Sequence, residues 1–246
     1  MTKILANDGI SQAGIDALKA KGFNIVTEHV PQDDLINTIK KEKYEVLLVR
    51  SSTIVRKDLI DACPHLKIVG RGGVGMDNID VEYARKKGIN VINTPAASSA
   101  SVAELVFAHL FGMVRFLFDS NRQMPMIGDS DFKALKKSYA NGKELTGKTL
   151  GIIGFGRIGQ EVAKRAIGLG MNVMAHDKFI EEASITLNFF NGDKKSFTIE
   201  TESLEEVLNN SDFISLHIPK IGDKPVIGAE QIGMMKTGAG IVNASR

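Results

Sequence analysis

The sequence predicts an α/β protein built from two doubly wound parallel sheets, and three observations lead to this fold class. Short apolar segments alternate with helix-forming segments over residues 3–95. The same alternation returns near Thr149 and continues to the last residues. Between the two stretches lie Pro95 and a run of small residues, which is typical of a domain boundary. Because such alternation produces parallel strands joined by right-handed crossovers, we expect two domains, at 1–96 and 97–246.

The first domain is expected to contain five strands separated by helices. Apolar segments fit strands at 3–7, 23–28, 44–50, 66–70 and 89–95. The first helical segment has a Ser11 cap and closes at Gly22, which is a usual pair of helix boundaries. The second begins at Pro31 with acids in its first turn. Two shorter helical segments follow at 56–63 and 80–88.

The second domain opens with a long apolar segment, "VAELVFAHLFGMVRFLF", which predicts a helix at 102–118. Ser98, Ser99 and Ser101 can each cap this helix, and Ser101 and Glu104 have the spacing of a capping box. The charged residues within the segment favour a buried or interface helix over a membrane span, and His109 is expected to be packed. The polar segment at 120–145 is expected to bridge to the next strand.

From Thr149 onward the pattern predicts a second series of strands and helices. The segment "ITLNFFNGDKKSFTIE" fits a surface hairpin around Asn191 and Gly192. "SLEEVLNN" and "AEQIGMMKTG" predict helices, and "SDFISLHIPK" and "AGIVNAS" predict strands.

Composition limits the classes of function. A net charge of +2 over 246 residues gives no reason to expect nucleic acid or an anionic membrane as a partner. The hydrophobic content of 43% and charged content of 24% are ordinary for a soluble globular protein. One cysteine, Cys63, cannot form an internal disulfide, so a cytoplasmic location is expected. No cysteine or histidine cluster suggests a metal site.

Gly154, Gly156 and Gly159 form a GxGxxG motif that follows an apolar strand and opens a helix. In this context each glycine has a reason: Gly154 permits the tight turn, Gly156 lets the backbone approach a pyrophosphate, and Gly159 allows close packing of helix and sheet. The amides of Arg157 and Ile158 then lie at the helix N-terminus, where the helix dipole favours an anion. The alternative is that these glycines serve tight packing alone.

Asp177 follows Gly159 at the end of the next strand, where a carboxylate can accept hydrogen bonds from both ribose hydroxyls of a dinucleotide. The same charge would repel a 2′-phosphate, so the sequence favours NAD over NADP. The alternative is a solvated acid at the end of a strand.

Five motifs occur in the order that is typical of one family. "VGRGGVGMDNID", "NTPAASSASVAEL", "GKTLGIIGFGRIGQEVAKRAIGLGMNVMAHD", "SDFISLHIP" and "VNASR" resemble D-isomer-specific 2-hydroxyacid dehydrogenases along essentially the whole chain. "LLVRSSTIV" resembles the D-3-phosphoglycerate dehydrogenase branch. The resemblance implies a flavodoxin-like substrate domain, a Rossmann NAD domain and a homodimer formed through the NAD domain.

The resemblance also implies roles for residues of the first domain. The turn that contains Gly73 and Val74 matches one that offers backbone amides to the substrate carboxylate, as an anion nest can. Arg50 and Ser51 match residues that contact substrate. A plain structural turn and a surface ion pair are the respective alternatives.

In the second domain the resemblance implies contacts around the nicotinamide. Arg246 matches the catalytic arginine, which holds the substrate carboxylate and polarises the reacting carbonyl. Ile218 matches a position near the nicotinamide, and Asn243, Ala244 and Ser245 match a stretch lining the same ring.

The family mechanism also uses a histidine and glutamate pair that lies beyond the catalytic arginine. We therefore expect the chain to be truncated, with the last strands of the NAD domain and the closing helix of the substrate domain missing. His217 is the one histidine near the expected cleft, but its motif position is not that of the proton-transfer residue. A chain of 246 residues is expected to bind NADH without turnover.

The leading expectation is oxidation of D-3-phosphoglycerate with NAD in serine biosynthesis. A glyoxylate or hydroxypyruvate reductase of the same family is the first alternative, because a small 2-hydroxy or 2-keto acid is the substrate in each case. The alternative from another class is a non-catalytic NAD-sensing protein that resembles the C-terminal-binding co-repressors.

Overall fold

The computed structural model describes residues 2–219 and 225–245. The chain divides into two compact units, Met1–Ser98 (unit 1) and Ser99–Arg246 (unit 2). Both sheets are parallel α/β sheets of the doubly wound kind, so the predicted fold class is confirmed.

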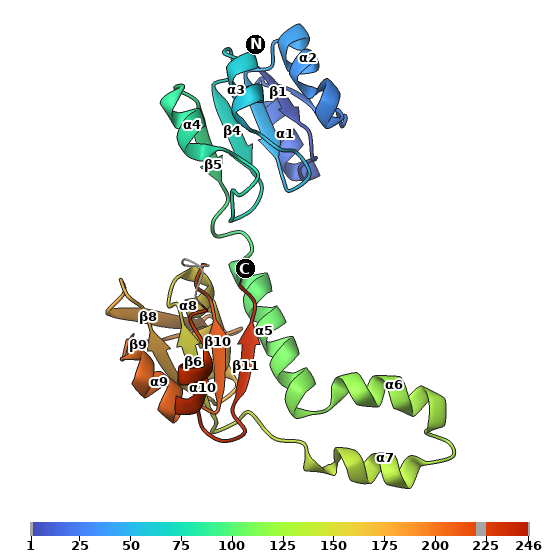
Figure 1. Ribbon diagram of the computed structural model, residues 1–246, viewed down its shortest axis with the longest axis vertical. Coiled ribbons are helices and arrows are strands. Elements are labelled where there is room, and N and C mark those ends of the chain that lie inside the picture. Colours follow the sequence, from blue (N-terminus) through green and yellow to red (C-terminus); the bar gives the residue numbers. More distant parts are fainter. Residues whose placement is uncertain (1, 220–224, 246) are drawn as a thin grey trace. The chain divides into compact units, whose positions relative to one another are not determined.

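Unit 1 contains a five-stranded sheet in the order β2-β1-β3-β4-β5 (Figure 1). This order is that of the flavodoxin-like fold, in which ligands bind beyond the carboxyl ends of the strands. The strands are β1 (Lys3–Ala6), β2 (Asn24–Val26), β3 (Val46–Val49), β4 (Ile68–Arg71) and β5 (Asn90–Asn93). The helices are α1 (Gln12–Ala20), α2 (Gln32–Glu42), α3 (Lys57–Ala62) and α4 (Val81–Lys86).

The core of unit 1 lies on one face of its sheet. Leu5, Leu47 and Val69 pack there against α2 and α3. No residue of α1 is buried. Because successive side chains of a strand point to opposite faces, Ile92 of β5 points away from this core, and it is 54% exposed. Unit 1 therefore presents apolar surface on its other face.

Unit 2 contains a four-stranded sheet in the order β11-β10-β6-β7. Its strands are β6 (Thr149–Ile153), β7 (Asn172–His176), β10 (Phe213–Leu216) and β11 (Gly240–Asn243). The helices α5 (Ser99–Val114) and α8 (Arg157–Gly168) share one apolar core with the sheet. The other face packs against α9 (Leu204–Asn210), which contacts α10 (Ala229–Met234).

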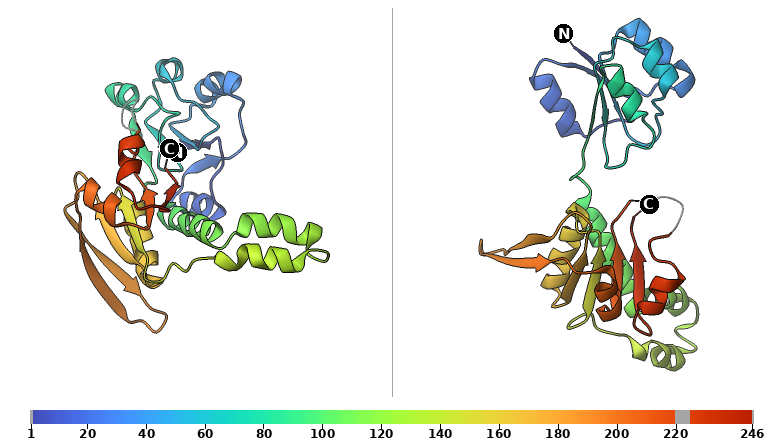
Figure 2. Two further views of the ribbon diagram at one scale, coloured as in Figure 1. Left: turned by 60° about the horizontal axis from the view of Figure 1, so that its bottom comes forward. Right: turned by 60° about the vertical axis from the view of Figure 1, so that its left-hand side comes forward.

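An antiparallel ribbon leaves the body of unit 2 after β7 (Figure 2). It consists of β8 (Glu182–Asn188) and β9 (Lys194–Glu200), joined by a turn in which the amide of Phe189 donates to the carbonyl oxygen of Asp193. The predicted hairpin is confirmed. Ile185 anchors the ribbon in the core of unit 2.

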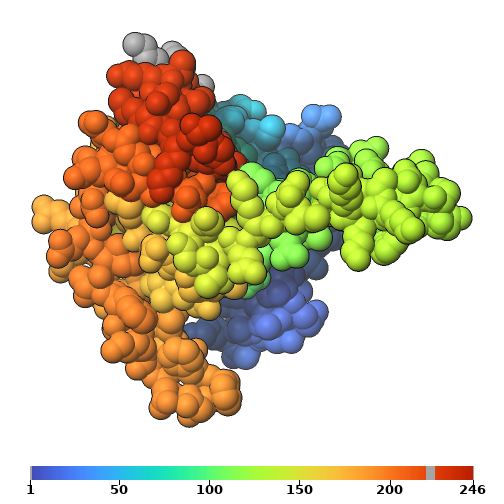
Figure 3. All heavy atoms as spheres, turned by 90° about the horizontal axis from the view of Figure 1, so that it is seen from below, coloured from blue at the N-terminus to red at the C-terminus, as the bar shows by residue number. Residues whose placement is uncertain are grey.

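The segment after α5 is helical, which the sequence analysis did not predict. Phe116 adopts a left-handed backbone (φ 54°) that ends the long helix and starts α6 (Leu117–Ile127). α7 (Phe132–Ser138) and a 3-10 turn (Tyr139–Asn141) follow. We call residues 117–141 the arm, because it projects from the sheet of unit 2 (Figures 1 and 3).

Two expectations about the long helix were wrong. It begins at Ser99, so Ser101 lies inside it and cannot form a capping box with Glu104. Of the three predicted caps, Ser98 is the one that directly precedes the helix. Glu104 instead pairs with Arg165 of α8 at 3.0 Å. His109 is exposed, because the buried side of the helix runs through Ala103, Val106 and Leu110. No single described helix is long and apolar enough to span a membrane, but the α5 and α6 pair, bent by 57°, meets that test by length and composition alone.

Candidate dinucleotide and substrate sites

Two of the three motif glycines are required by the packing of unit 2 itself. Gly154 has φ +95°, and a Cβ there would lie 2.7 Å from the carbonyl oxygen of His217. A Cβ on Gly159 would collide with the carbonyl oxygen of Gly154. Any side chain at either position would therefore push the turn away from the sheet.

Gly156 has no such requirement. Its φ is −71°, and nothing in the described structure lies within 4 Å of a Cβ built on it. α8 begins at the next residue, and Gly156 supplies no side-chain cap for the amides of Arg157 and Ile158. Uncapped amides at a helix N-terminus, beside open space, fit a pyrophosphate. Packing among the described residues therefore gives no reason for a glycine at position 156.

Asp177 is fixed by the main chain around it. One carboxylate oxygen accepts the amide of Phe155 at 2.7 Å, which ties the glycine turn to the end of β7. The other accepts the amides of Phe179 at 2.9 Å and Ile180 at 3.2 Å. This is not the solvated acid of the alternative interpretation. Because a carboxylate has about four lone-pair sites, it can still accept a ribose hydroxyl.

The other predicted cofactor residues lie at the carboxyl ends of β10 and β11. A methyl group of Ile218 would lie 2.7 Å from a Cβ on Gly154, so Ile218 adjoins the glycine turn. The side-chain oxygen of Asn243 accepts two hydrogen bonds from Ser245, one from its amide at 2.9 Å and one from its hydroxyl at 2.7 Å. Ala244 packs against the core of unit 2. Arg246, the predicted catalytic residue, lies outside the described residues.

His217 is poorly suited to accept a proton at neutral pH. Burial lowers its pKa to about 4. Its Nε2 lies 2.7 Å from the hydroxyl oxygen of Ser215, and its Nδ1 is buried without a partner among the described residues. A base with so low a pKa would take a hydroxyl proton inefficiently.

In unit 1, Arg50 and Ser51 directly follow β3 and are exposed. The Cγ of Arg50 lies 3.6 Å from the position of a Cβ on Gly72, so its side chain runs beside the loop after β4. In the part of the chain that the structure describes, the Arg50 guanidinium has no carboxylate partner. The alternative of a surface ion pair therefore has no support here.

Some backbone groups of the loop after β4 already have hydrogen-bond partners, and others do not. The amide of Gly73 donates to the carbonyl oxygen of Arg71 at 3.0 Å. The carbonyl oxygens of Gly73 and Val74 accept from the Thr94 amide at 3.2 Å and the Asn93 side chain at 2.8 Å. The amides of Val74 and Gly75 have no acceptor within the described ranges. They are the donors that this loop can offer to an anion.

Arg71 is a further candidate residue, which was not predicted from the sequence. It is 7% exposed at the end of β4, and its Nε donates to the carbonyl oxygen of Arg50 at 3.3 Å. Its Nη1 would lie 2.6 Å from a Cβ on Gly73. Over residues 2–219 and 225–245 its charge has no carboxylate partner. The sequence did offer a signal, which is a charged residue at the end of a buried strand. Buried charges are normally paired, so such a residue needs a partner.

No group of three or more His, Cys, Asp or Glu side chains among the described residues is placed to hold a metal ion. The lone thiol, Cys63, is buried, and burial raises its pKa.

Comparison with known proteins identifies relatives over the whole chain. The family model for the catalytic domain of D-isomer specific 2-hydroxyacid dehydrogenases matches residues 4–212. A hydroxypyruvate reductase of Thermotoga maritima is 40% identical over 246 residues, which cover 99% of this chain and 74% of the relative. A D-3-phosphoglycerate dehydrogenase of Methanocaldococcus jannaschii is also 40% identical, over 100% of this chain but 44% of the relative.

Solved structures agree with this result. The crystal structure of 3-phosphoglycerate dehydrogenase from Entamoeba histolytica with bound NAD⁺ superposes with a TM-score of 0.71 at 28% identity. The match covers 100% of this chain and 72% of that chain.

Proposed function

The chain belongs to the D-isomer specific 2-hydroxyacid dehydrogenase family, and we propose that it takes part in the NAD-dependent oxidation of D-3-phosphoglycerate to 3-phosphohydroxypyruvate. This reaction is a step of serine biosynthesis. The chain spans less than half the length of the phosphoglycerate dehydrogenase relative described above, so the activity of the whole protein is part of the proposal, as is a cytoplasmic location.

The observation that carries the substrate assignment is the pair of guanidinium groups beyond the carboxyl ends of β3 and β4. Arg50 and Arg71 lie next to each other there, and neither has a carboxylate partner among the described residues. The amides of Val74 and Gly75 add two donors. A substrate with both a carboxylate and a phosphate would supply negatively charged partners for these two guanidinium groups.

Unit 2 would hold the cofactor. The amides at the start of α8 would bind the pyrophosphate, and the Asp177 carboxylate would accept a ribose hydroxyl. NAD, when bound, accepts a hydride at its nicotinamide ring. The residues Ile218, Asn243, Ala244 and Ser245 are proposed to line that ring.

The reaction moves a hydride from C2 of the substrate and a proton from the C2 hydroxyl, and leaves a carbonyl. We propose that Arg246 holds the substrate carboxylate and stabilises the charge on the developing carbonyl oxygen. His217 is not proposed as the proton acceptor, because burial holds its pKa at about 4.

A second candidate function is hydroxypyruvate reduction. It is favoured by the 40% identity to the Thermotoga maritima enzyme, of which this chain covers the larger share. Its substrate lacks the phosphate group, which carries a charge of about −1.5 to −2 at pH 7, so the role of Arg50 separates the two candidates.

The test measures NADH oxidation by the whole protein, and not by the 246-residue chain alone, with phosphohydroxypyruvate, hydroxypyruvate and glyoxylate. We expect the phosphorylated acid to have the highest kcat/KM. Arg50→Gln is expected to lower that value by about tenfold, the usual cost of losing a charge-assisted contact, and to leave hydroxypyruvate nearly unaffected. Lys19→Gln, a surface change on α1, is the charge-matched control. A higher kcat/KM for hydroxypyruvate in the unaltered protein would favour the second candidate.

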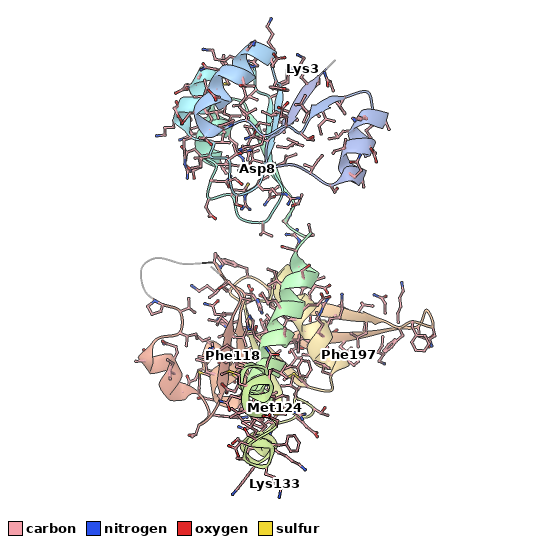
Figure 4. All side chains as sticks on the ribbon, turned by 90° about the vertical axis from the view of Figure 1, so that its right-hand side faces the viewer. Lys3, Asp8, Phe118, Met124, Lys133 and Phe197 are labelled. Carbon is pink, nitrogen blue, oxygen red and sulfur yellow. The ribbon has the colours of Figure 1, made fainter. Side chains whose placement is uncertain are left out.

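We further propose a homodimer formed through unit 2. The arm exposes large apolar side chains that include Phe118 (68% exposed), Met126 (79%) and Phe132, and Phe118 and Met124 lie on α6 (Figure 4). Large apolar side chains exposed together on one segment favour an interaction site. Phe118→Ser with Met126→Ser is expected to yield monomers by light scattering, whereas Lys133→Ser on α7 is the control.

A further inference from the structure

The loop at residues 50–53, between β3 and α3, is fixed through its main-chain amides. One carboxylate oxygen of Asp8 accepts the amide of Arg50 at 2.6 Å and the amide of Thr53 at 3.1 Å. The other accepts the hydroxyl of Thr53 at 2.6 Å. Asp8 follows β1, at the opposite end of that strand from Lys3 (Figure 4). One carboxylate therefore holds both ends of the loop.

Asn78 holds the same loop through its carbonyl groups. Its Nδ2 donates to the carbonyl oxygen of Arg50 at 2.8 Å and to that of Thr53 at 2.6 Å. An oxygen at this position would face two carbonyl oxygens, so the orientation of the amide follows from its partners. Its Oδ1 is buried without a partner in the described structure. The side chain thus leaves its own acceptor unsatisfied while it donates twice to the loop.

The electrostatics of Asp8 agree with this arrangement. Burial by itself would raise the pKa of Asp8. Hydrogen bonds from the Thr53 hydroxyl and from the amides of Arg50 and Thr53, together with the nearby His29, outweigh burial and leave the pKa below its ordinary value. Asp8 is therefore a carboxylate throughout the neutral range, and its hydrogen bonds to the loop are charge-assisted.

The arrangement also determines how the loop can meet an anion. Successive amides of a turn commonly bind external anions, but here Asp8 already occupies those of Arg50 and Thr53. The carbonyl oxygen of Arg50 is likewise engaged, by Asn78 and Arg71. The group of Arg50 that remains for a ligand is its guanidinium, whose position follows from the fixed main chain.

We propose that Asp8 and Asn78 are positioning residues, which clamp the main chain of loop 50–53 and so present the Arg50 guanidinium to the substrate phosphate. This inference rests on the proposed function, because it requires Arg50 to contact the substrate. Asp8 and Asn78 themselves do not touch the substrate.

The test is a double-mutant cycle on substrate binding. The protein saturated with NADH is titrated in a calorimeter with D-3-phosphoglycerate and with D-glycerate, which lacks the phosphate. Asp8→Asn is expected to reduce the preference for the phosphorylated acid about tenfold, and Arg50→Gln to reduce it equally. The double variant is expected to lose no more than either single variant, because both act through one contact. Asp16→Asn, an exposed carboxylate bonded to Gln12, is the matched control.

The affinity for NADH separates positioning from general damage, because the NADH-binding residues belong to unit 2. It is expected to stay within about twofold of the unaltered protein in every variant, since all the changed residues belong to unit 1. If Asp8→Asn fails to fold, Asn78→Ala replaces it in the same cycle with the same expectations.

Two results would overturn the inference in distinguishable ways. An unaltered protein that binds D-glycerate as tightly as D-3-phosphoglycerate would contradict the proposed substrate and the inference with it. If instead the unaltered protein clearly prefers D-3-phosphoglycerate and Asp8→Asn keeps that preference, this result would overturn the positioning role alone. The same conclusion would follow if the reductions in preference caused by Asp8→Asn and Arg50→Gln added up in the double variant.

Discussion

In unit 2 the loop after β6 is shaped by glycines, whereas in unit 1 the loop after β3 is shaped by side chains from two other elements. The turn at Gly154 needs a left-handed backbone and close approach to the strand end at His217. Loop 50–53 has ordinary residues and depends on Asp8 and Asn78 for its conformation. The first kind of loop is specified locally, whereas the second exists only once distant parts of the chain have packed.

The largest effect is expected from the glycine that packing requires most. Gly159→Ala would place a Cβ against the carbonyl oxygen of Gly154, which the backbone cannot easily move. We expect a loss of about 2–4 kcal/mol of unfolding free energy, measured by urea titration, with NADH binding lost as well. Gly168→Ala, in the same helix and with open space around it, is the control. Equal stability of the two variants would refute the packing argument.

The two units are also expected to differ in their response to acid. In unit 2, burial lowers the pKa of His217 from 6.5 to about 4, so the unfolded chain binds a proton at a higher pH than the folded chain does. The contribution of neutral His217 to the free energy of unfolding is therefore fully present above pH 6.5. It is lost as the pH drops toward 4, by an amount of order 3 kcal/mol at most.

In unit 1 the sign of the pH effect is the same but the range is different. The pKa of Asp8 is lowered from 3.8, so its stabilising effect is present above that value and is lost only at lower pH. Between pH 7 and pH 5, the opening free energy from hydrogen exchange, corrected for the pH dependence of the intrinsic exchange rate, should therefore fall in unit 2 and stay constant in loop 50–53. His217→Gln should remove the change in unit 2, and a change that persists in this variant would exclude His217 as its cause.

A smaller effect is expected at the cofactor-selecting carboxylate. Asp177→Asn removes a charge that disfavours a 2′-phosphate, and it weakens the bonds to the amides of Phe155 and Phe179. We expect NADH affinity to fall about tenfold, the value of one charge-assisted hydrogen bond, while NADPH affinity rises relative to it. Asp193→Asn, at the tip of the ribbon, is the control. An unchanged ratio of the two affinities would remove Asp177 from cofactor selection.

The difference between the two loops explains what could be predicted from the sequence. Parallel strands and the glycine turn could be predicted, because apolar periodicity and positive-φ positions are encoded within a few residues. The clamp could not, because Asp8 lies 42 residues before Arg50, and Asn78 lies 28 residues after it. No local pattern indicates that three such residues will meet.

The helices α6 and α7 of the arm were not predicted from the sequence, and the physical reason is a different one. The arm is polar along much of its sequence, and Pro125 lies within α6, so it resembles a loop by composition. Its helices have little buried surface in this chain: no residue of α6 is buried, and in α7 only Leu135 among the described residues is. A segment whose apolar residues face outward gives no amphipathic signal toward its own core.

We ascribe the open space at Gly156 in unit 2 to a bound dinucleotide, and NADH titration of a valine variant tests this assignment. NADH is titrated by its own fluorescence, since the chain contains no tryptophan to interfere, into the unaltered protein and Gly156→Val, with the thermal midpoint of each recorded. A Cβ at Gly156 meets nothing within 4 Å, so we expect similar midpoints and an affinity for NADH at least about 30-fold lower in the variant. Tight NADH binding by Gly156→Val would mean that the space at Gly156 does not belong to the cofactor.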